Sequence, residues 1–109
     1  MRKVARAKRH FVTITVEKGR LFYSLPSFFA KRGDTIKWTS SYPFAIDLGW
    51  ESPLLKERYQ VNAKKLVGTK VRRDAPYGRY KYFVAVWNGK KILTDDPEFI
   101  VRRDGSEEN

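Results

Sequence analysis

The sequence contains no cysteine, and only one histidine and one methionine occur among its 109 residues. Disulfide bonds are therefore excluded, as are metal sites built from thiolates or from several imidazoles. A cysteine nucleophile, a pair of histidines and a glycine-rich phosphate loop are all missing, so we expect the protein not to be an enzyme. The lack of cysteine is typical of a reducing compartment, and we expect a cytoplasmic protein.

Long apolar runs are missing too. No segment is apolar and long enough to be a transmembrane helix. Residues 1–10 are basic, like the first part of a secretion signal, but residues 11–17 are too few and too polar to form its apolar core. The basic segment also lacks the apolar face of an interfacial helix, so no membrane association is expected.

Acidic residues are scarce over most of the chain. Residues 1–93 hold 21 lysines and arginines against 6 aspartates and glutamates, whereas residues 94–109 hold 2 against 6. The net charge of the whole chain is +11. A body this positive attracts polyanions such as nucleic acid or an acidic protein surface. The acidic segment 104–109 is expected to be a frayed tail.

Apolar and polar residues alternate along much of the chain. Several short segments place an apolar residue at every second position, which is the period of a half-buried β-strand. Turn signals separate these segments. The segments expected to be strands are 11–16 (with Val12, Ile14 and Val16 inward), 34–39 (Ile36, Trp38), 44–48 (Phe44, Ile46, Leu48), 58–62 (Tyr59, Val61), 79–87 (Tyr80, Tyr82, Val84, Val86), 90–94 and 98–102.

Two local signals refine this pattern. The Asn88-Gly89 dipeptide is typical of a two-residue turn with positive φ at both positions, and it predicts a hairpin between 79–87 and 90–94. The Ser52-Pro53 dipeptide is typical of a helix start, and it predicts one or two helical turns over 54–57.

Together these patterns predict one all-β domain spanning residues 1–109, with a basic N-terminal arm at 1–9. The expected architecture is a Greek-key β-sandwich of seven or eight strands with at most one short helix.

Three segments resemble, in the right order, segments of the cupredoxins, the family of small blue copper proteins. Residues 32–38 (RGDTIKW) are similar to a glycine turn and the strand after it. Residues 42–46 (YPFAI) resemble the segment that carries the first copper-binding histidine, and residues 78–84 (GRYKYFV) resemble the strand that carries the cysteine. The similarity covers residues 33–101 and is most specific in GDTIKW. It implies a cupredoxin-like fold.

The resemblance also shows that the copper ligands are missing. Phe44 stands at the position of the first histidine, Val84 at the cysteine and Trp87 at the second histidine, and no methionine follows in 88–93. Because a blue-copper site needs a thiolate and two imidazoles, the resemblance implies the fold without copper, cofactor or electron transfer. Phe44, Val84 and Trp87 are expected to fill the former metal pocket as packed core.

The candidate binding residues are basic and lie in the arm and in segment 64–73. They are Arg2, Lys3, Arg6, Lys8, Arg9, Lys64, Lys65, Lys70, Arg72 and Arg73. On one shared face they would neutralise several phosphates, and Tyr77, Trp87 or the Phe28-Phe29 pair could stack on bases. No nucleic-acid-binding motif accompanies the charge. The alternative is that these cations only solvate the strands and protect sheet edges from aggregation.

Trp50, in the segment 48–55, is a candidate anchor for a protein partner, since tryptophan is enriched in binding hot spots. The alternative is that Trp50 caps one end of the sandwich as core. We hypothesise a non-enzymatic, copper-free binding or accessory module whose basic surface contacts an acidic protein. The alternative function is sequence-nonspecific binding of DNA or RNA. The oligomeric state is not specified by the sequence.

One acidic cluster, Asp95-Asp96-Pro97-Glu98, offers carboxylate oxygens of the kind that Mg²⁺ or Ca²⁺ prefers. Such a run is more typical of a turn in which proline opens the next strand. We therefore predict a turn and no metal site.

Overall fold

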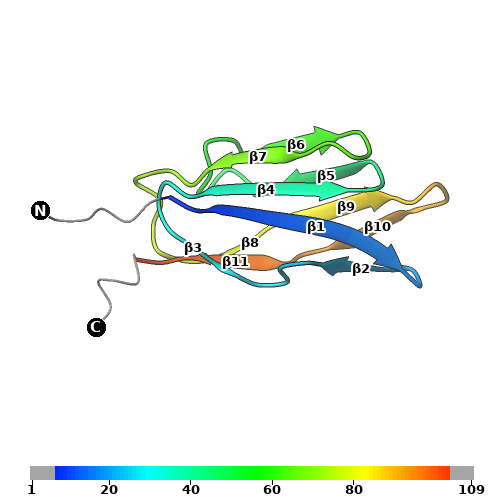
Figure 1. The fold of residues 1–109 in the computed structure, drawn as a ribbon, viewed down its shortest axis with the longest axis horizontal. Helices are drawn as coiled ribbons and strands as arrows, with labels where there is room; N and C mark the ends of the chain where they lie inside the picture. The colour runs from blue at the N-terminus through cyan, green and yellow to red at the C-terminus, as the bar shows by residue number, and fades with distance from the viewer. Residues whose placement is uncertain (1–6, 104–109) are drawn as a thin grey trace, which may run out of the picture.

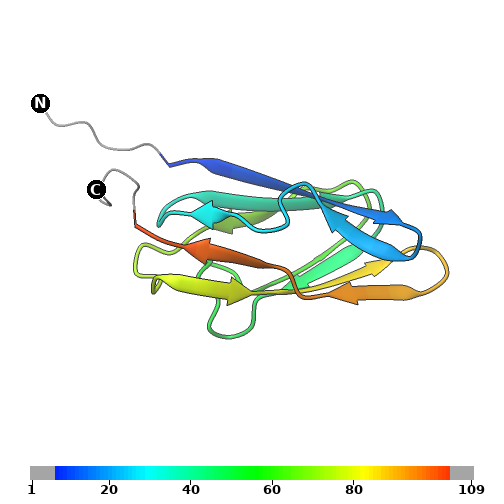
Figure 2. The same ribbon diagram turned by 90° about the horizontal axis from the view of Figure 1, so that it is seen from below.

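The computed structural model describes residues 7–103, which form two packed layers of β-strands (Figures 1 and 2). No helix occurs in this range, and so none that could span a membrane. The strands are β1 (Arg9–Glu17), β2 (Arg20–Tyr23), β3 (Phe29–Ala30), β4 (Thr35–Ser40), β5 (Phe44–Asp47), β6 (Arg58–Val61), β7 (Val67–Lys70), β8 (Gly78–Lys81), β9 (Phe83–Trp87), β10 (Ile92–Asp95) and β11 (Glu98–Val101).

The first layer is the sheet β2-β1-β4-β7, which faces the viewer in Figure 1. In this sheet β1 runs parallel to β4, and the other pairs are antiparallel. The second layer consists of the sheets β10-β9-β5-β6 and β3-β11-β8. Only Tyr82 separates β8 from β9, and only Asp96 and Pro97 separate β10 from β11, so these strands follow one another end to end along the layer (Figure 2). The all-β sandwich is therefore as predicted.

The core lies between the layers and is built from the inward half of each alternating strand. The buried residues at the inward positions predicted from the sequence are Val12, Ile14, Ile36, Trp38, Phe44, Ile46, Tyr59, Tyr82, Val84 and Val86. Burial of an apolar side chain of this size stabilises the fold by about 1.5–3 kcal/mol. This burial accounts for the alternation in the sequence without any reference to function.

Trp38 occupies the centre of an aromatic cluster in this core. Its ring centroid lies 5.2 Å from that of Tyr82 and 6.0 Å from that of Tyr59. Burial raises the pKa of Tyr59 to about 12. Burial also raises the pKa of Tyr82 to about 12, an effect that the neighbouring indole of Trp38 partly offsets. Both phenols therefore remain neutral at physiological pH.

The prediction of seven or eight strands is wrong in number, since the described residues form eleven short ones. One predicted strand, 79–87, is interrupted at Tyr82 and forms both β8 and β9. Three strands, β2, β3 and β7, were not predicted at all. β3 has two residues, and β7 (VGTK) contains a glycine and has no alternating pattern, so neither carries the signal on which the prediction depended.

The positive-φ hairpin turn occurs at a different dipeptide from the one predicted. Lys18 and Gly19, with φ of 52° and 74°, join β1 to β2 as a two-residue turn. At the predicted site only Gly89 has positive φ, because the side-chain oxygen of Asn88 accepts hydrogen bonds from the backbone N–H groups of Lys90 and Lys91. The hairpin between β9 and β10 is confirmed, but it has a longer turn held by a side chain.

The predicted helix over 54–57 does not form. The hydroxyl oxygen of Ser52 accepts a hydrogen bond from the backbone N–H of Leu54 at 3.0 Å, as in a turn. Leu54 then forms an isolated antiparallel bridge with Val71 and is buried. Long-range pairing and burial of Leu54 therefore outweigh the local helix signal.

The motif RGDTIKW fastens the start of β1 to β4. Asp34 is buried, and its carboxylate accepts hydrogen bonds at 2.9 Å from the backbone N–H groups of Lys8 and Lys31. The ring Nε2 of His10 donates a third to it, also at 2.9 Å. The backbone N–H of Thr35 also donates to the carbonyl oxygen of Lys8. The backbone of Lys8 and Arg9 is therefore held beside β4, and residues 1–6 of the predicted arm lie outside the described residues.

Candidate functional site

The positions that correspond to copper ligands do not form a packed pocket. Phe44 and Val84 are buried, as expected, but the side chain of Trp87 is 46% exposed, so its predicted place in the core is wrong. Strand β9 pairs with β10 as far as Trp87 and Ile92. Because side chains alternate along a strand, residues 84 and 87 must lie on opposite faces.

Trp87 instead lines an open groove of about 510 Å³ on the second layer. The small side chains of Ala45 and Ala85 also line it, together with Ile92 and the amide of Gln60. None of the lining residues is a histidine, cysteine or methionine. Among the described residues no group of three or more histidine, cysteine, aspartate or glutamate side chains could hold a metal ion.

The acidic cluster at 95–98 does not form the predicted turn, because it spans the end of β10, a two-residue link and the start of β11. Its carboxylates have protein partners. Asp95 accepts a hydrogen bond from the hydroxyl of Tyr23 at 3.0 Å. Asp96 pairs with Lys81 at 3.4 Å, and Glu98 pairs with Arg79 at 3.1 Å. Burial of Tyr23 and the negative charge of Asp95 together raise the pKa of the Tyr23 phenol. These oxygens thus serve contacts within the fold.

The outer surface of the first sheet brings together cations from three strands. Arg9 of β1 pairs with Thr35 of β4, and Thr35 pairs with Lys70 of β7. Lys37 lies two residues further along the same face of β4. From the usual strand spacing and rise, Arg9, Lys37 and Lys70 emerge within about 10 Å of one another. We call this surface, defined by these three cations and Phe11, the cationic face.

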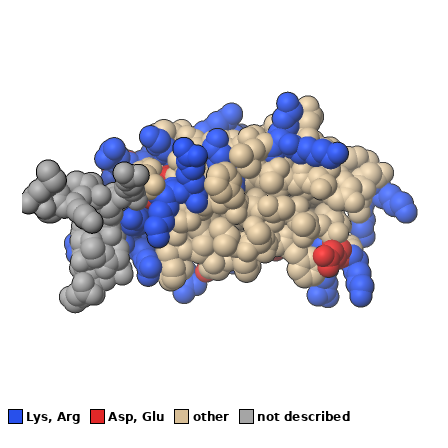
Figure 3. Space-filling model, viewed as in Figure 1, with Lys and Arg blue, Asp and Glu red and all other residues tan. Residues whose placement is uncertain are grey.

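The cations of the cationic face have no carboxylate partner. Within residues 7–103, Arg9, Lys37 and Lys70 form no side-chain ion pair or hydrogen bond. The only carboxylate among the outward residues of the four strands is Glu17, opposite Arg20 at the far end of β1. Figure 3 shows this side of the molecule, with blue side chains gathered toward the end near the chain termini and few red atoms.

The predicted basic segment 64–73 is divided by this arrangement. Lys70 lies beside Thr35, the first residue of β4, whereas the backbone N–H of Lys64 binds the carbonyl oxygen of Ser40, the last residue of β4. Lys64 and Lys65 are therefore about 17 Å from Lys70 along the sheet. Of the predicted residues, the structure brings Arg9 and Lys70 together on one sheet surface. Arg2, Lys3 and Arg6 lie outside the described residues.

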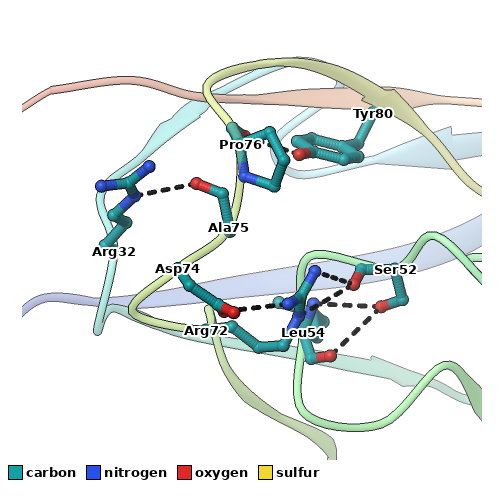
Figure 4. Close-up of polar contacts among 8 residues, drawn as sticks. All are labelled: Arg32, Ser52, Leu54, Arg72, Asp74, Ala75, Pro76 and Tyr80. Carbon is teal, nitrogen blue, oxygen red and sulfur yellow. Dashed lines mark hydrogen bonds and ion pairs between the residues drawn. The ribbon is translucent and has the colours of Figure 1, made fainter.

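Arg72 is not free to bind a partner. Its Nε and one terminal nitrogen donate hydrogen bonds to the carbonyl oxygen of Ser52 at 3.2 and 3.0 Å, and its other terminal nitrogen contacts Asp74 at 2.8 Å (Figure 4). Arg73, the next residue, is exposed and has no partner in the described range. The two arginines therefore differ, although the sequence grouped them together.

The same crossover from β7 to β8 is fastened at two further points in Figure 4. The guanidinium of Arg32 donates to the carbonyl oxygen of Ala75 at 2.8 Å and lies 4.0 Å from the ring centroid of Tyr77. The hydroxyl of Tyr80 donates to the carbonyl oxygen of Pro76. Arg32 and Tyr77 thus contribute to the fold, and the Tyr77 side chain is 47% exposed.

Sequence reasoning missed three residues of this surface. Lys37 was assigned only as the polar half of a strand, and Phe11 and Phe22 were not considered as binding residues. Phe11 is 47% exposed beside Lys37, and Phe22 is 46% exposed on β2. The signal for Phe11 is parity: in β1 the even positions are apolar and inward, so the odd-numbered Phe11 must face solvent. Phe22 lies on β2, a strand that was not predicted, so its outward position carried no such signal.

Trp50 lies in the loop between β5 and β6, which projects from the second layer, on the side opposite to β1 (Figure 2). Its side chain is 84% exposed, so the interpretation of Trp50 as core is wrong. Leu55 in the same loop is 67% exposed. The role of Trp50 as a partner anchor stays a prediction.

Comparisons with known proteins support the fold. No family model matches the chain, and no curated protein sequence matches it. The solved structure of an oxidized mutant of amicyanin, a cupredoxin, matches with a TM-score of 0.50 and 15% identity, over 84% of this chain and 81% of that chain. An identity this low informs on architecture alone. The two-layer arrangement, the order of the strands and this match together show that the chain has a cupredoxin-like fold.

Proposed function

We propose that this chain is a non-catalytic binding module that contacts a polyanionic partner through the cationic face. The observation that carries the proposal is the grouping of Arg9, Lys37 and Lys70 on one sheet surface without a carboxylate partner in the described range. Like charges at this spacing lie within about one Debye length at physiological salt, so they repel one another. An anionic partner relieves that repulsion and releases counterions from its own surface.

Two partner classes present such an anionic surface, an acidic protein and a nucleic acid. A cupredoxin-like fold by itself selects neither, because function depends on the site that a fold carries. A protein partner has one observation of its own in its favour. Trp50 and Leu55 expose large apolar groups on a projecting loop, as a hot spot of a protein interface does. That loop and the cationic face lie on different sides of the molecule, so the two proposals can be tested separately.

The test is a salt titration of polyanion binding with two matched double variants. Lys37→Gln/Lys70→Gln removes two cations of the cationic face, whereas Lys90→Gln/Lys91→Gln removes two exposed, unpaired cations from the β9–β10 hairpin. The probe is a labelled single strand of deoxythymidine. We expect the first variant to flatten the slope of log affinity against log salt by about 1.4, at about 0.7 per lost contact, and the second to leave it nearly unchanged.

Two results would overturn the proposal. Equal losses in both variants would show that the charge acts as a property of the whole surface and not through the cationic face. If the unmodified protein bound no polyanion at low salt, the proposed function itself would be wrong.

A further inference from the structure

We infer that the polyanion held by the cationic face is single-stranded nucleic acid, with bases stacked on Phe11 and Phe22. This inference rests on the proposed function and names the partner class for the same site. It goes beyond charge because it depends on two exposed aromatic rings on the outer surface of the first sheet, one beside the cations and one further along β1.

The rings lie on the same outward surface as the cations. Phe11 is 47% exposed and sits beside Lys37 across the β1–β4 pairing, with Arg9 two residues before it on the same face. Phe22 is 46% exposed and lies opposite Thr15 across the β1–β2 pairing. From strand rise and spacing, Phe11 and Phe22 are about 14 Å apart. A short extended strand running along β1 could therefore reach both rings, with the phosphates at its Phe11 end nearest to Arg9 and Lys37.

The groups between the rings suit the sugar–phosphate backbone. Thr13 lies between Phe11 and Thr15 on the outward side of β1, and Thr39 lies beside Thr13 across the pairing with β4. Their hydroxyl groups can donate to phosphate oxygens, as threonine commonly does in nucleic-acid complexes. Directly beside Lys37, β7 contributes Gly68, which adds no side chain to the surface. The surface between the two rings is thus lined by threonine side chains.

The exposed rings favour a single strand over the other polyanions. The faces of the bases in a duplex are stacked on one another and cannot reach an aromatic ring, whereas those of a single strand can. An acidic protein surface would desolvate its carboxylates against Phe11 and Phe22 without any stacking in return. Single-stranded nucleic acid is the one partner that uses both the cations and the rings.

The second layer also exposes a phenylalanine, but the charged residues around it are paired. Phe83, at 50% exposure, matches Phe11 in type and exposure. However, it pairs with Asp47, whose carboxylate lies 3.4 Å from the guanidinium of Arg58. The nearby Lys81 is likewise paired with Asp96. Phe83 therefore lies among neutralised charges and serves as a matched control.

The experiment compares Phe11→Ala and Phe22→Ala with Phe83→Ala on three probes at one salt concentration. The probes are a labelled single strand of deoxythymidine, a duplex of the same length, and polyglutamate. Stacking of one base is lost in each test variant, so we expect the affinity for the single strand to fall about tenfold in Phe11→Ala and in Phe22→Ala. Phe83→Ala, and all three variants on duplex or polyglutamate, should change the affinity by less than about twofold.

A rescue variant separates stacking from damage to the fold. Phe11→Trp keeps an aromatic plane at this position and should retain the affinity of the unmodified protein, or exceed it. A loss in Phe11→Trp equal to that in Phe11→Ala would contradict stacking.

The outcomes also separate this inference from the proposed function. If the phenylalanine variants bind the single strand normally while Lys37→Gln/Lys70→Gln does not, the cationic face stands and the stacking inference is wrong. If polyglutamate binds more tightly than the single strand, the partner class is an acidic protein. If no probe binds, both proposals are wrong.

Discussion

The guanidinium of Arg72 donates two hydrogen bonds to the carbonyl oxygen of Ser52, at 3.2 and 3.0 Å. This contact joins the loop before β6 to the crossover between β7 and β8, and Ser52 is buried. Arg73, one residue later, has no such contact within residues 7–103. Two adjacent arginines of one basic run thus have different tasks, the first in the fold and the second at the surface.

Arg72→Ala should therefore reduce stability, and Arg73→Ala should not. Removing the Arg72 guanidinium leaves a buried carbonyl oxygen without its donors, which costs about 2–3 kcal/mol in free energy of unfolding. Arg73→Ala should change the free energy of unfolding by less than about 0.5 kcal/mol. Urea denaturation of both variants measures the difference. Equal midpoints would show that the Arg72–Ser52 contact contributes nothing to the fold.

Asp34→Asn tests the fastening of β1 to β4. An amide in place of the carboxylate keeps the size but cannot accept all the hydrogen bonds from Lys8, Lys31 and His10, so a buried polar group is left unsatisfied. We expect a loss of about 3 kcal/mol in free energy of unfolding. The control is Asp74→Asn, whose side chain is 81% exposed and should cost less than about 1 kcal/mol by the same urea measurement. A loss in Asp34→Asn no larger than in the control would rule out this role.

The sequence predicted the fold where local pattern and burial agree. Val12, Ile14, Ile36 and Trp38 follow a period of two and are buried, because the strands that carry them have one face on the core. It failed where the structure depends on distant residues. Leu54 pairs with Val71, the residue that follows β7, and this long-range pairing prevents the helix predicted from Ser52. No local sequence pattern encodes such a pairing.

The candidate site was predicted only in part, for a similar reason. Basic residues can be counted in a sequence, but their partners cannot. Arg72 donates hydrogen bonds to the carbonyl oxygen of Ser52, and Lys64 lies at the end of the sheet opposite to Lys70. Lys37 lies close to Arg9 only because β1 pairs in parallel with β4. Such a pairing brings together residues far apart in sequence. The composition therefore predicted the positive charge, but it could not predict which cations share one surface.

Gly68→Ala should destabilise the pairing of β4 with β7. A Cβ at this position would lie 1.9 Å from the carbonyl oxygen of Ile36, and the backbone φ of 148° is strained for any other residue. Because the obstacle is backbone, it cannot move aside, and we expect a loss of about 3 kcal/mol in free energy of unfolding.

The control for this prediction is Gly89→Ala, where φ is 95° but nothing lies within 4 Å of the added Cβ. It should cost only about 1 kcal/mol, from backbone strain alone. Thermal or urea unfolding of both variants measures the comparison. Equal costs would mean that φ, and not the close approach of β4, requires glycine at position 68.

Alkaline pH should destabilise the fold through its buried tyrosines. Burial raises the pKa of Tyr59 and of Tyr82 from 10.0 to about 12, so the folded state holds these two phenol protons more tightly than the unfolded chain. The stability that they contribute is complete below pH 10 and is lost as the pH rises toward 12. Urea midpoints measured across this range should fall with pH.

Titration of tyrosinate absorbance checks the same point residue by residue. The folded protein should show late-ionising tyrosines that the urea-unfolded protein lacks, and Tyr59→Phe should remove one of them. The hydroxyl of Tyr59 is buried without a hydrogen-bond partner in the described range, so this variant should be neutral or stabilising by up to about 1 kcal/mol. Ionisation of Tyr59 together with exposed tyrosines would show that its phenol is accessible to water.

Trp50→Ala should change neither the stability of the fold nor the binding of a polyanion to the cationic face. With 84% of its side chain exposed, Trp50 buries little area, so the free energy of unfolding should change by less than about 0.5 kcal/mol. Affinity for a labelled polyanion should change by less than about twofold, since the loop and the cationic face lie on different sides of the molecule. The fraction of tryptophan fluorescence quenched by acrylamide should fall, because Trp38 is fully buried and Trp87 only half exposed. A marked loss of stability would mean that Trp50 packs against the body of the domain, and the case for Trp50 as a partner anchor would then be lost.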